Sequence, residues 1–561
     1  MQGQRERSRN GPTRREMVVA TGASAIALAV GAGEARGRTL AKGSVFEDLS
    51  GTARRGPRDR GIPDVLVSNG RDVVRTDPEG EWRLPLVEGD CVFVIKPPNW
   101  SVPLGPGGLP QFSYLHQPIG SPKAVPYRHA GVAPTGDLPN SIDFALRRQE
   151  ESKDFDALLL ADTQPANDRE LGYLRDDIVA GLLGNTAAFA INHGDVVFDD
   201  LSLYPRYLQV IGATGIPWHH CPGNHDINQE AHEDRFSRET WKRVFGPRHY
   251  AFQHAGTTFI MLDNVHYAGR NLARTQGGTY GGRIGNQQLQ FIRNVLAHVP
   301  RDQLVVLSMH IPLVTYQDPS DLANNTIDRA ALLEILAGRP NTVSFSGHMH
   351  LTEHHYLGAH AHHHHVLAAA SGGWWGGPHD RRGIPLADCP DGVPNGFHVL
   401  EVRGSHYSTR FVPAPGKARG RLRAIIDGPH RQRPLDAMSC DGDAVVCRDE
   451  VNACNLIVNV FDGGPRTRVA YEIAGRASLI QMKRMTMPDP VVAKLFARAP
   501  RLQAPWVTAV PASHIWTAPL PPGLQAGVHR LTVHATDEYG MKLVAHLMVE
   551  VTQSNSAASP A

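Results

Sequence analysis

The sequence predicts an α/β domain with an all-β region on each side of it. Between residues 153 and 370, apolar runs of strand length alternate with amphipathic stretches typical of helices. Before and after this part, short alternating runs are separated by turns rich in Gly, Pro and Asn, which is typical of antiparallel sheets. The chain has 561 residues, too many for a single hydrophobic core, so several domains are expected.

The first 40 residues differ in composition from the rest. A basic stretch, RERSRNGPTRREM, precedes the apolar run VVATGASAIALAVGAG and the sequence EARG, where Ala35 is a plausible cleavage point. This order is typical of a secretory signal peptide, and Arg14-Arg15 favours twin-arginine export. The alternative is a basic tail before an uncleaved anchor, but the apolar run is short for a membrane span. We therefore expect residues 1–40 to direct export to the periplasm or cell surface of a bacterium, with no transmembrane segment in the mature chain.

Residues 41–125 are predicted to form a β-sandwich. Val65, Val67 and Val73 follow the strand period, and turns are expected at Ser68-Asn69-Gly70 and at residues 77–80. Residues 126–152 then read as a linker, because Pro and Gly are frequent up to that point.

The α/β domain is expected over residues 153–370, with helices at 168–184 and 285–299. Short strands return afterwards, which predicts a second all-β domain over residues 371–553. Residues 554–561 are small and polar, and they are expected to form a disordered tail.

Five apolar runs of the α/β domain end in polar residues of one chemical kind. A single Asp after a strand is usually a turn residue or a helix N-cap, and chance explains one or two such cases. Ligands of open α/β sheets bind beyond the carboxyl ends of the strands, so the whole set is expected at one rim. The clusters are Asp162-Thr163-Gln164, His193-Gly194-Asp195, Gly223-Asn224-His225-Asp226, His310 and Gly347-His348-Met349-His350.

These side chains form a coherent set of metal ligands. Carboxylate, amide oxygen and imidazole suit divalent Mn, Fe, Zn or Co better than soft thiolate sites do. Glycine precedes Asp195, Asn224 and His348, where it would let the backbone turn tightly beside an ion. Two neighbouring ions would clamp a phosphoryl group and activate water.

The ordered series D-x-[H/Q], GD, GNHD, H and GHxH, over about residues 153–352, resembles the calcineurin-like metallophosphoesterase superfamily. The resemblance implies a four-layer α/β/β/α sandwich, here flanked by two all-β domains, and two divalent metal ions. It assigns the first metal to Asp162, Gln164, Asp195 and His350, and the second to Asp195, Asn224, His310 and His348. It also implies attack by metal-bound hydroxide, without a phospho-enzyme, and gives the metal-free His225 the task of stabilising the transition state or protonating the leaving group. Asp195 and Asn224 complete the predicted catalytic set.

The flanking regions resemble those of the exported bacterial subgroup of this family. The stretch GIPDVLVSNGRDVVRTDPEGEW is similar to a transthyretin-like N-terminal domain, and SGGWWGGPHD and DGVPNGF are similar to the start of the C-terminal domain. Trp374, Trp375 and Asn395 of the latter are candidate substrate contacts, because exposed Trp stacks on sugars and bases. A Trp pair that plugs a domain interface is the alternative, and we expect one Trp in each role.

Two features depart from the family pattern. Gln164 stands where His is commoner, and a neutral amide oxygen predicts weaker metal binding at the first site. The second motif reads GDVVFDD and lacks the Arg of GDxxDR, which argues against a protein phosphatase.

Several other His and Cys residues are interpreted as structural. The seven histidines between residues 354 and 365 are expected in a solvated loop that runs into a strand, in preference to a metal site. His219, His220, His249 and Tyr250 are expected in the core. Of six cysteines, Cys440, Cys447 and Cys454 lie close enough for one bridge, whereas Cys91, Cys221 and Cys389 are expected to be unpaired.

The favoured function is hydrolysis of a small phosphomonoester or phosphodiester, such as a nucleotide, a sugar phosphate or a lipid head group. The alternative is a weak or inactive metal-holding protein that binds a cell-envelope glycan. A nuclease is disfavoured because the net charge is only +2 and no basic stripe accompanies the motifs, so no nucleic-acid partner is expected.

Overall fold

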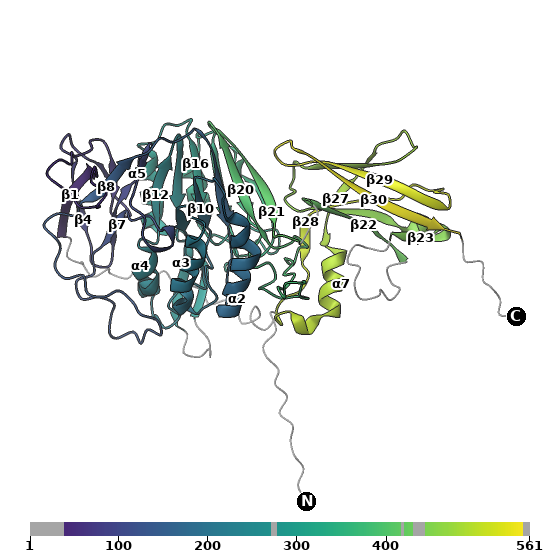
Figure 1. The fold of residues 1–561 in the computed structure, drawn as a ribbon, viewed down its shortest axis with the longest axis horizontal. Coiled ribbons are helices and arrows are strands. Elements are labelled where there is room, and N and C mark those ends of the chain that lie inside the picture. Colours follow the sequence, from purple (N-terminus) through teal and green to yellow (C-terminus); the bar gives the residue numbers. More distant parts are fainter. Residues whose placement is uncertain (1–38, 271–277, 417–419, 430–443, 554–561) are drawn as a thin grey trace, which may run out of the picture.

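The computed structural model describes residues 39–270, 278–416, 420–429 and 444–553, and Figure 1 shows three bodies in a row. The predicted export signal lies outside the described residues except for its last two positions. The predicted tail and Cys440 also lie outside them, so the bridge expected near Cys440 stays a prediction. Among the described residues, no helix combines the length and the apolar character needed to cross a bilayer.

The N-terminal domain is a sandwich of two four-stranded sheets, with strand orders β4-β1-β8-β6 and β3-β2-β5-β7. Its strands are β1 (Thr39–Glu47), β2 (Leu66–Ser68), β3 (Val73–Arg75), β4 (Glu81–Leu86), β5 (Cys91–Ile95), β6 (Trp100–Ser101), β7 (Ser113–Leu115) and β8 (Phe144–Arg148). The linker predicted at 126–152 is therefore wrong in part, because β8 pairs with β1 and buries Phe144 and Leu146. The preceding Pro/Gly-rich stretch hid this short strand.

The α/β domain, which is called the catalytic domain from here on because the family resemblance implies catalysis there, contains two sheets packed face to face. The first has the order β11-β10-β9-β20-β21 and the second β12-β13-β16-β17-β19-β18. The first sheet consists of β9 (Asp154–Leu160), β10 (Phe189–Asn192), β11 (Trp218–His220), β20 (Gly396–Arg403) and β21 (His406–Pro413). The second consists of β12 (Tyr250–His254), β13 (Thr257–Met261), β16 (Leu304–Ser308), β17 (Thr342–Ser346), β18 (Glu353–Leu357) and β19 (His362–Val366). The strands β14 (Val265–Arg270) and β15 (Gly278–Gly282) form a separate two-stranded ribbon.

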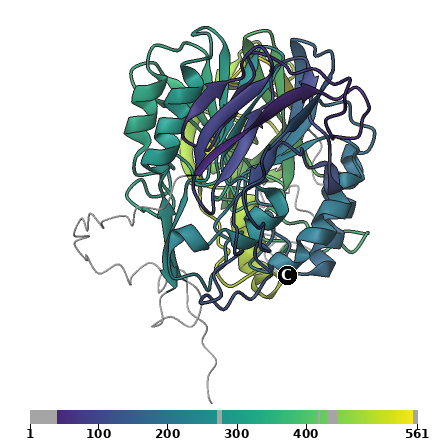
Figure 2. The same ribbon diagram turned by 90° about the vertical axis from the view of Figure 1, so that its left-hand side faces the viewer.

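Helices cover the outer faces of both sheets, as Figure 2 shows. These are α2 (Asp168–Tyr173), which continues in irregular helical turns to Leu182, α3 (Tyr204–Gly212), α4 (Glu239–Phe245), α5 (Gly285–Leu296) and α6 (Arg329–Leu336). On β9, Leu159 faces the core between the sheets, whereas Leu158 and Leu160 pack with residues of α2 and α3. The predicted four-layer α/β/β/α sandwich is confirmed.

The predicted domain boundary at residue 371 does not coincide with the end of the first sheet. β20 pairs antiparallel with β9, with His398 opposite Leu159, and β21 continues the same sheet. The catalytic domain therefore extends to residue 413. Strand periodicity is the same in both domains, so the sequence did not reveal that these strands return to the first sheet.

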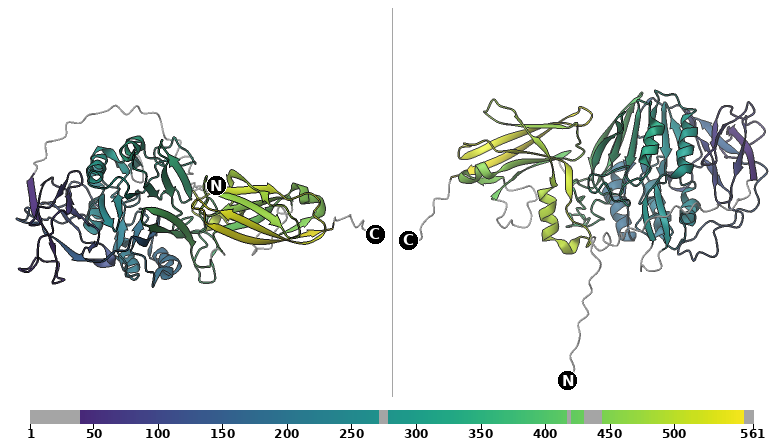
Figure 3. Two further views of the ribbon diagram at one scale, coloured as in Figure 1. Left: turned by 90° about the horizontal axis from the view of Figure 1, so that it is seen from above. Right: turned by 180° about the vertical axis from the view of Figure 1, so that it is seen from behind.

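The C-terminal domain is a second β-sandwich, which projects from the catalytic domain in Figure 3. One sheet contains β22 (Leu422–Asp427), β24 (Asn455–Val460), β27 (Lys483–Pro488) and β28 (Pro511–Pro519). The other contains β23 (Val445–Cys447), β25 (Arg468–Ile473), β26 (Ile480–Gln481), β29 (Gly527–Thr536) and β30 (Lys542–Thr552). Its helix α7 (Pro490–Arg498) begins after Asp489, whose carboxylate caps the backbone N–H of Val491 and Val492.

The His-rich segment is not a solvated loop, which corrects the expectation for residues 354–365. It forms the hairpin β18–β19, and all four histidines of β19 are buried. The imidazoles on one face of β19 find hydroxyl partners on β17, because Ser344 lies 2.9 Å from His362 Nε2 and 2.8 Å from His364 Nδ1. Serine and threonine hydroxyls on the neighbouring strand thus provide hydrogen-bond partners for the buried imidazoles, which composition alone does not predict.

The smaller structural predictions agree with the structure. His219, His220, His249 and Tyr250 are buried. Cys91, Cys221 and Cys389 are buried and unpaired.

Candidate metal centre

The polar clusters do meet at one rim, because each follows the carboxyl end of a strand. β9, β10 and β11 run parallel and lead to Asp162, Asp195 and Asn224. β16 and β17 run parallel in the facing sheet and lead to His310 and His348. The seven predicted ligands are Asp162, Gln164, Asp195, Asn224, His310, His348 and His350, and all are buried except the half-buried His348.

The backbone at these positions is unusual. Five of the predicted ligands have positive φ: Asp162 (50°), Gln164 (42°), Asp195 (51°), His348 (73°) and His350 (54°). Such conformations cost non-glycine residues about 1–3 kcal/mol each and cluster at functional sites. The glycines allow a close approach, since a Cβ on Gly223 would lie 2.1 Å from Asp195 Oδ1 and one on Gly347 would lie 2.4 Å from Asp162 Oδ2.

The second predicted site has the tightest geometry. Ligand atoms of Asp195, His310 and His348 all lie within 4.8 Å of one another. His310 Nε2 lies 3.3 Å from Asp195 Oδ1 and 2.9 Å from Asn224 Oδ1. Its Nδ1 lies 2.9 Å from the carbonyl oxygen of His193, which orients the ring. Asn324, which was not among the predicted site residues, contacts His348 Nε2 through Oδ1 at 3.0 Å.

The first predicted site brings Asp162, Gln164 and His350 together. His350 donates through Nδ1 to the carbonyl oxygen of Gly372 at 2.5 Å, and its Nε2 lies 3.6 Å from Asp162 Oδ1. Gln164 donates through Nε2 to Asp195 Oδ2 at 3.1 Å. Its Oε1 is buried and accepts no hydrogen bond within the described part of the chain. An orphaned amide oxygen is costly unless a cation binds it, so the site fits a metal ion.

The electrostatics of the cluster favour added positive charge. Burial, together with the nearby Asp195, raises the pKa of Asp162. Burial alone would lower the pKa of His310, but Asp195 and Asp162 raise it to about 9. The carboxylates of Asp195 and Asp162 thus favour positive charge at the His310 ring. The donor set therefore fits the predicted pair of divalent cations.

His225 adjoins this centre and is held by contacts of its own. Its backbone N–H donates to Asp195 Oδ1 at 2.9 Å, and its Nδ1 lies 2.8 Å from Asp199 Oδ1. The ring stacks on Phe198 with a centroid distance of 4.4 Å. Asp199 was not predicted as a site residue, although it stands in the GDVVFDD motif.

Aromatic side chains flank the centre. Trp374 is half-buried, has φ 56° and stacks on His350 at 3.8 Å between ring centroids. Trp506 belongs to the C-terminal domain, and its ring centroid lies 6.3 Å from the ring centroids of both Trp374 and Phe198. Trp506 was not predicted as a site residue, because it is far along the chain from the motifs that form the centre.

The other two candidate substrate residues are buried. Trp375 donates through Nε1 to the carbonyl oxygen of Thr163 at 2.9 Å, which supports the loop between Asp162 and Gln164. Asn395 is fully buried and donates to Asp177 at 2.9 Å and to the carbonyl oxygen of Ala370 at 3.1 Å. A substrate contact by Asn395 is therefore a wrong prediction, since the side chain has no exposed surface.

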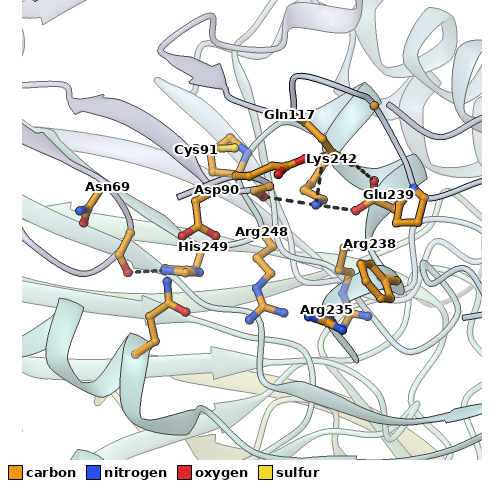
Figure 4. A pocket seen from close by; sticks show the side chains of 18 of the residues that line it. Asn69, Asp90, Cys91, Gln117, Arg235, Arg238, Glu239, Lys242, Arg248 and His249 are labelled. Carbon is orange, nitrogen blue, oxygen red and sulfur yellow. Dashed lines mark hydrogen bonds and ion pairs between the residues drawn. The ribbon is translucent and has the colours of Figure 1, made fainter. Parts of the chain in front are cut away.

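A hollow of about 400 Å³ lies elsewhere, between the N-terminal and catalytic domains (Figure 4). None of the predicted metal ligands lines it, and His249 contacts the carbonyl oxygen of Gly70 there at 2.7 Å. Its cations all pair with carboxylates, as Arg235–Glu233, Arg238–Asp263, Lys242–Glu239 and Arg248–Asp234. None of these four cationic side chains is therefore free to bind a phosphate in the hollow.

Comparison with known proteins identifies two parts of the chain. Residues 156–351 match the family model of the calcineurin-like phosphoesterase, and residues 364–543 match that of the C terminal of calcineurin-like phosphoesterase. No curated protein matches the chain.

Two solved structures are distantly similar. The purple acid phosphatase PPD1 from yellow lupin (Lupinus luteus) seeds is 12% identical over 67% of this chain and 71% of its own, with a TM-score of 0.34. GAP50, the anchor in the inner membrane complex of Plasmodium, is 14% identical over 47% of this chain and 86% of its own, with a TM-score of 0.30. Similarities of this size add nothing to the assignment, which rests on the two family models: over residues 156–351 and 364–543, the chain belongs to the calcineurin-like phosphoesterase superfamily.

Proposed function

We propose that the protein hydrolyses a small phosphomonoester or phosphodiester with two divalent cations. The observation that carries the proposal is the convergence of seven predicted ligands at the strand ends, with the orphaned Oε1 of Gln164 among them. Asp162, Gln164, Asp195 and His350 would hold one cation, and Asp195, Asn224, His310 and His348 the other. When bound, such a pair supplies positive charge to phosphoryl oxygens and acidifies water.

The chain's own residues supply the remaining steps. His225 carries a proton at Nε2 and delivers it to the leaving-group oxygen, since its other ring nitrogen is engaged by Asp199 at 2.8 Å. Phe198 fixes the plane of the imidazole by stacking. Trp374 and Trp506 offer apolar faces for the organic part of the substrate and exclude water beside the centre.

The test is the hydrolysis of bis-p-nitrophenyl phosphate and p-nitrophenyl phosphate by protein stripped with chelator and reloaded with Mn²⁺. We expect metal-dependent turnover that Asp195→Asn nearly abolishes, because Asp195 serves both sites. A wild-type rate in Asp195→Asn would overturn the proposal. No turnover of either ester with any divalent metal would favour the metal-holding, glycan-binding alternative.

We further propose that the protein is exported, on the basis of Arg14-Arg15 and the apolar run that follows them. A reporter fused behind residues 1–40 should reach the bacterial periplasm, and Arg14→Lys with Arg15→Lys should retain it in the cytoplasm. A reporter that stays inside with the native sequence would refute export.

A further inference from the structure

A second group of buried polar side chains lies apart from the centre described above, where the catalytic domain meets the C-terminal domain. His354 comes from β18, His365 from β19 and His398 from β20, so both sheets of the catalytic domain contribute. Asp462 follows β24 of the C-terminal domain. The three imidazoles are fully buried, and the side chain of Asp462 is only 8% exposed.

The three imidazoles converge on a single carboxylate oxygen. The Nε2 atoms of His354, His365 and His398 lie 3.2, 3.0 and 3.2 Å from Asp462 Oδ1. The ligand atoms of His354, His365 and Asp462 all lie within 4.8 Å of one another, whereas His398 approaches Asp462 but does not belong to this mutual group of three. In a tetrahedral zinc site with bonds of about 2.0–2.1 Å, neighbouring ligand atoms are about 3.3 Å apart. The imidazole–carboxylate distances are close to that value.

Hydrogen bonding alone leaves this group unsatisfied. A carboxylate oxygen has two lone pairs, so three imidazoles cannot all donate to it well. Neither ring nitrogen of His365 has a partner in good hydrogen-bond geometry within the described residues, although its Nε2 is 3.0 Å from Asp462 Oδ1. Nδ1 of His398 is also without a hydrogen bond among the described residues. A buried nitrogen without a hydrogen bond destabilises the fold, and a cation between the imidazoles and the carboxylate would give Nε2 of His365 a partner.

An outer layer of contacts orients the group. His354 Nδ1 lies 2.9 Å from His363 Nε2, and His363 Nδ1 lies 2.8 Å from the hydroxyl of Tyr407. Thr409 donates to the other oxygen of Asp462 at 3.4 Å. Metal-bound histidines are commonly held through their second ring nitrogen, and within the described residues only His354 of the three shows such a contact.

We propose that His354, His365 and Asp462, with His398 as the fourth donor, bind one zinc-class divalent cation. Three imidazoles and one carboxylate suit Zn²⁺, Co²⁺ or Ni²⁺, and four protein ligands leave no open position, which is typical of a structural site. Because β18, β19 and β20 belong to the catalytic domain and Asp462 to the C-terminal domain, the cation joins the two domains. This site is independent of the proposed hydrolytic centre.

Metal content of the full-length protein tests the proposal. The protein would be produced with zinc, washed with chelator until its zinc content is constant, and measured by elemental analysis beside His365→Ala and His364→Ala. His364 is the matched control, because it is buried on the same strand but has other partners. Its Nε2 accepts from the backbone N–H of Leu313, and its Nδ1 contacts the hydroxyl of Ser344 on β17. We expect wild type and His364→Ala to keep one more zinc per chain than His365→Ala. Equal zinc content in all three proteins, or none in the washed wild type, would overturn the proposal.

A crystal of the wild-type protein grown with zinc gives an answer even if His365→Ala does not fold. An anomalous peak within bonding distance of His354, His365 and Asp462 is expected. Absence of a peak there, with zinc in the crystal, would show that the four side chains form only a hydrogen-bonded cluster.

Discussion

Asp199 offers the sharpest test of how His225 is positioned. Its Oδ1 lies 2.8 Å from His225 Nδ1, and its side chain is 42% exposed. Asn is the appropriate replacement, because it tolerates the φ of 61° at this position and keeps an acceptor oxygen while it removes the charge. A hydrogen bond to a charged group contributes about 1.5–3 kcal/mol and a neutral one about 0.5–1.5. The exchange should therefore cost about 1–1.5 kcal/mol, roughly a five- to tenfold loss in kcat/KM.

The assay compares two leaving groups. p-Nitrophenolate departs without help from an acid, whereas an alkoxide needs a proton, so we expect the loss in Asp199→Asn with an alkyl ester such as glycerol phosphate and a smaller loss with p-nitrophenyl phosphate. Asp200→Asn is the matched control, because Asp200 accepts from Ser202 at the start of a helical turn. Equal losses with both esters, or the same loss in Asp200→Asn, would refute the positioning role of Asp199.

Three further predictions concern other residues. Gln164→Ala should raise the metal concentration needed for half-maximal reactivation at least tenfold, because it removes a ligand; an unchanged titration would exclude Gln164 from the first site. Trp374→Ala should raise KM for an aryl phosphoester two- to tenfold with a smaller change in kcat, since stacking contributes about 0.5–1.5 kcal/mol; an unaltered KM would place substrate elsewhere. Burial opposes ionisation of Glu151, but contacts with His254 and Lys96 lower its pKa from 4.5 to about 2, so its carboxylate stabilises the fold above about pH 4.5 and that contribution is lost between pH 4.5 and 2. Glu151→Gln should therefore reduce the free energy of unfolding by about 2–3 kcal/mol at pH 7, and urea titrations should find this difference shrinking below pH 4.5; a pH-independent difference would contradict the argument.

The parts of the site that follow strands could be predicted from the sequence. The apolar run before Asp162 or His310 predicts where that residue lies, because parallel strands end at one edge of a sheet. Asp199 and Asn324 contact His225 and His348 from loops, and no period in the sequence specifies how a loop folds back. Trp506 is harder still, since it reaches the centre from another domain.

The fold was predictable to the same degree and for the same reason. The individual strands and helices follow from periodicity, whereas their four-layer arrangement was implied by the family resemblance. β20 was placed in the second all-β domain, because a strand does not encode its partner. The prediction of a solvated loop for the His-rich segment failed for a different reason. Its burial depends on the hydroxyls of Thr342 and Ser344 across the sheet, and this pairing exists only after folding.

The contact of Trp506 with Trp374 and Phe198 has a consequence for how such a protein diversifies. The cations would be held entirely by the catalytic domain, whereas one face of the adjoining aromatic wall belongs to the C-terminal domain. Changes near residue 506 can then alter which organic groups fit without disturbing any metal ligand. If the proposed substrate contact of Trp506 holds, part of the substrate specificity would lie on a different domain from the metal ligands, and exchange of the C-terminal domain would change specificity without changing those ligands.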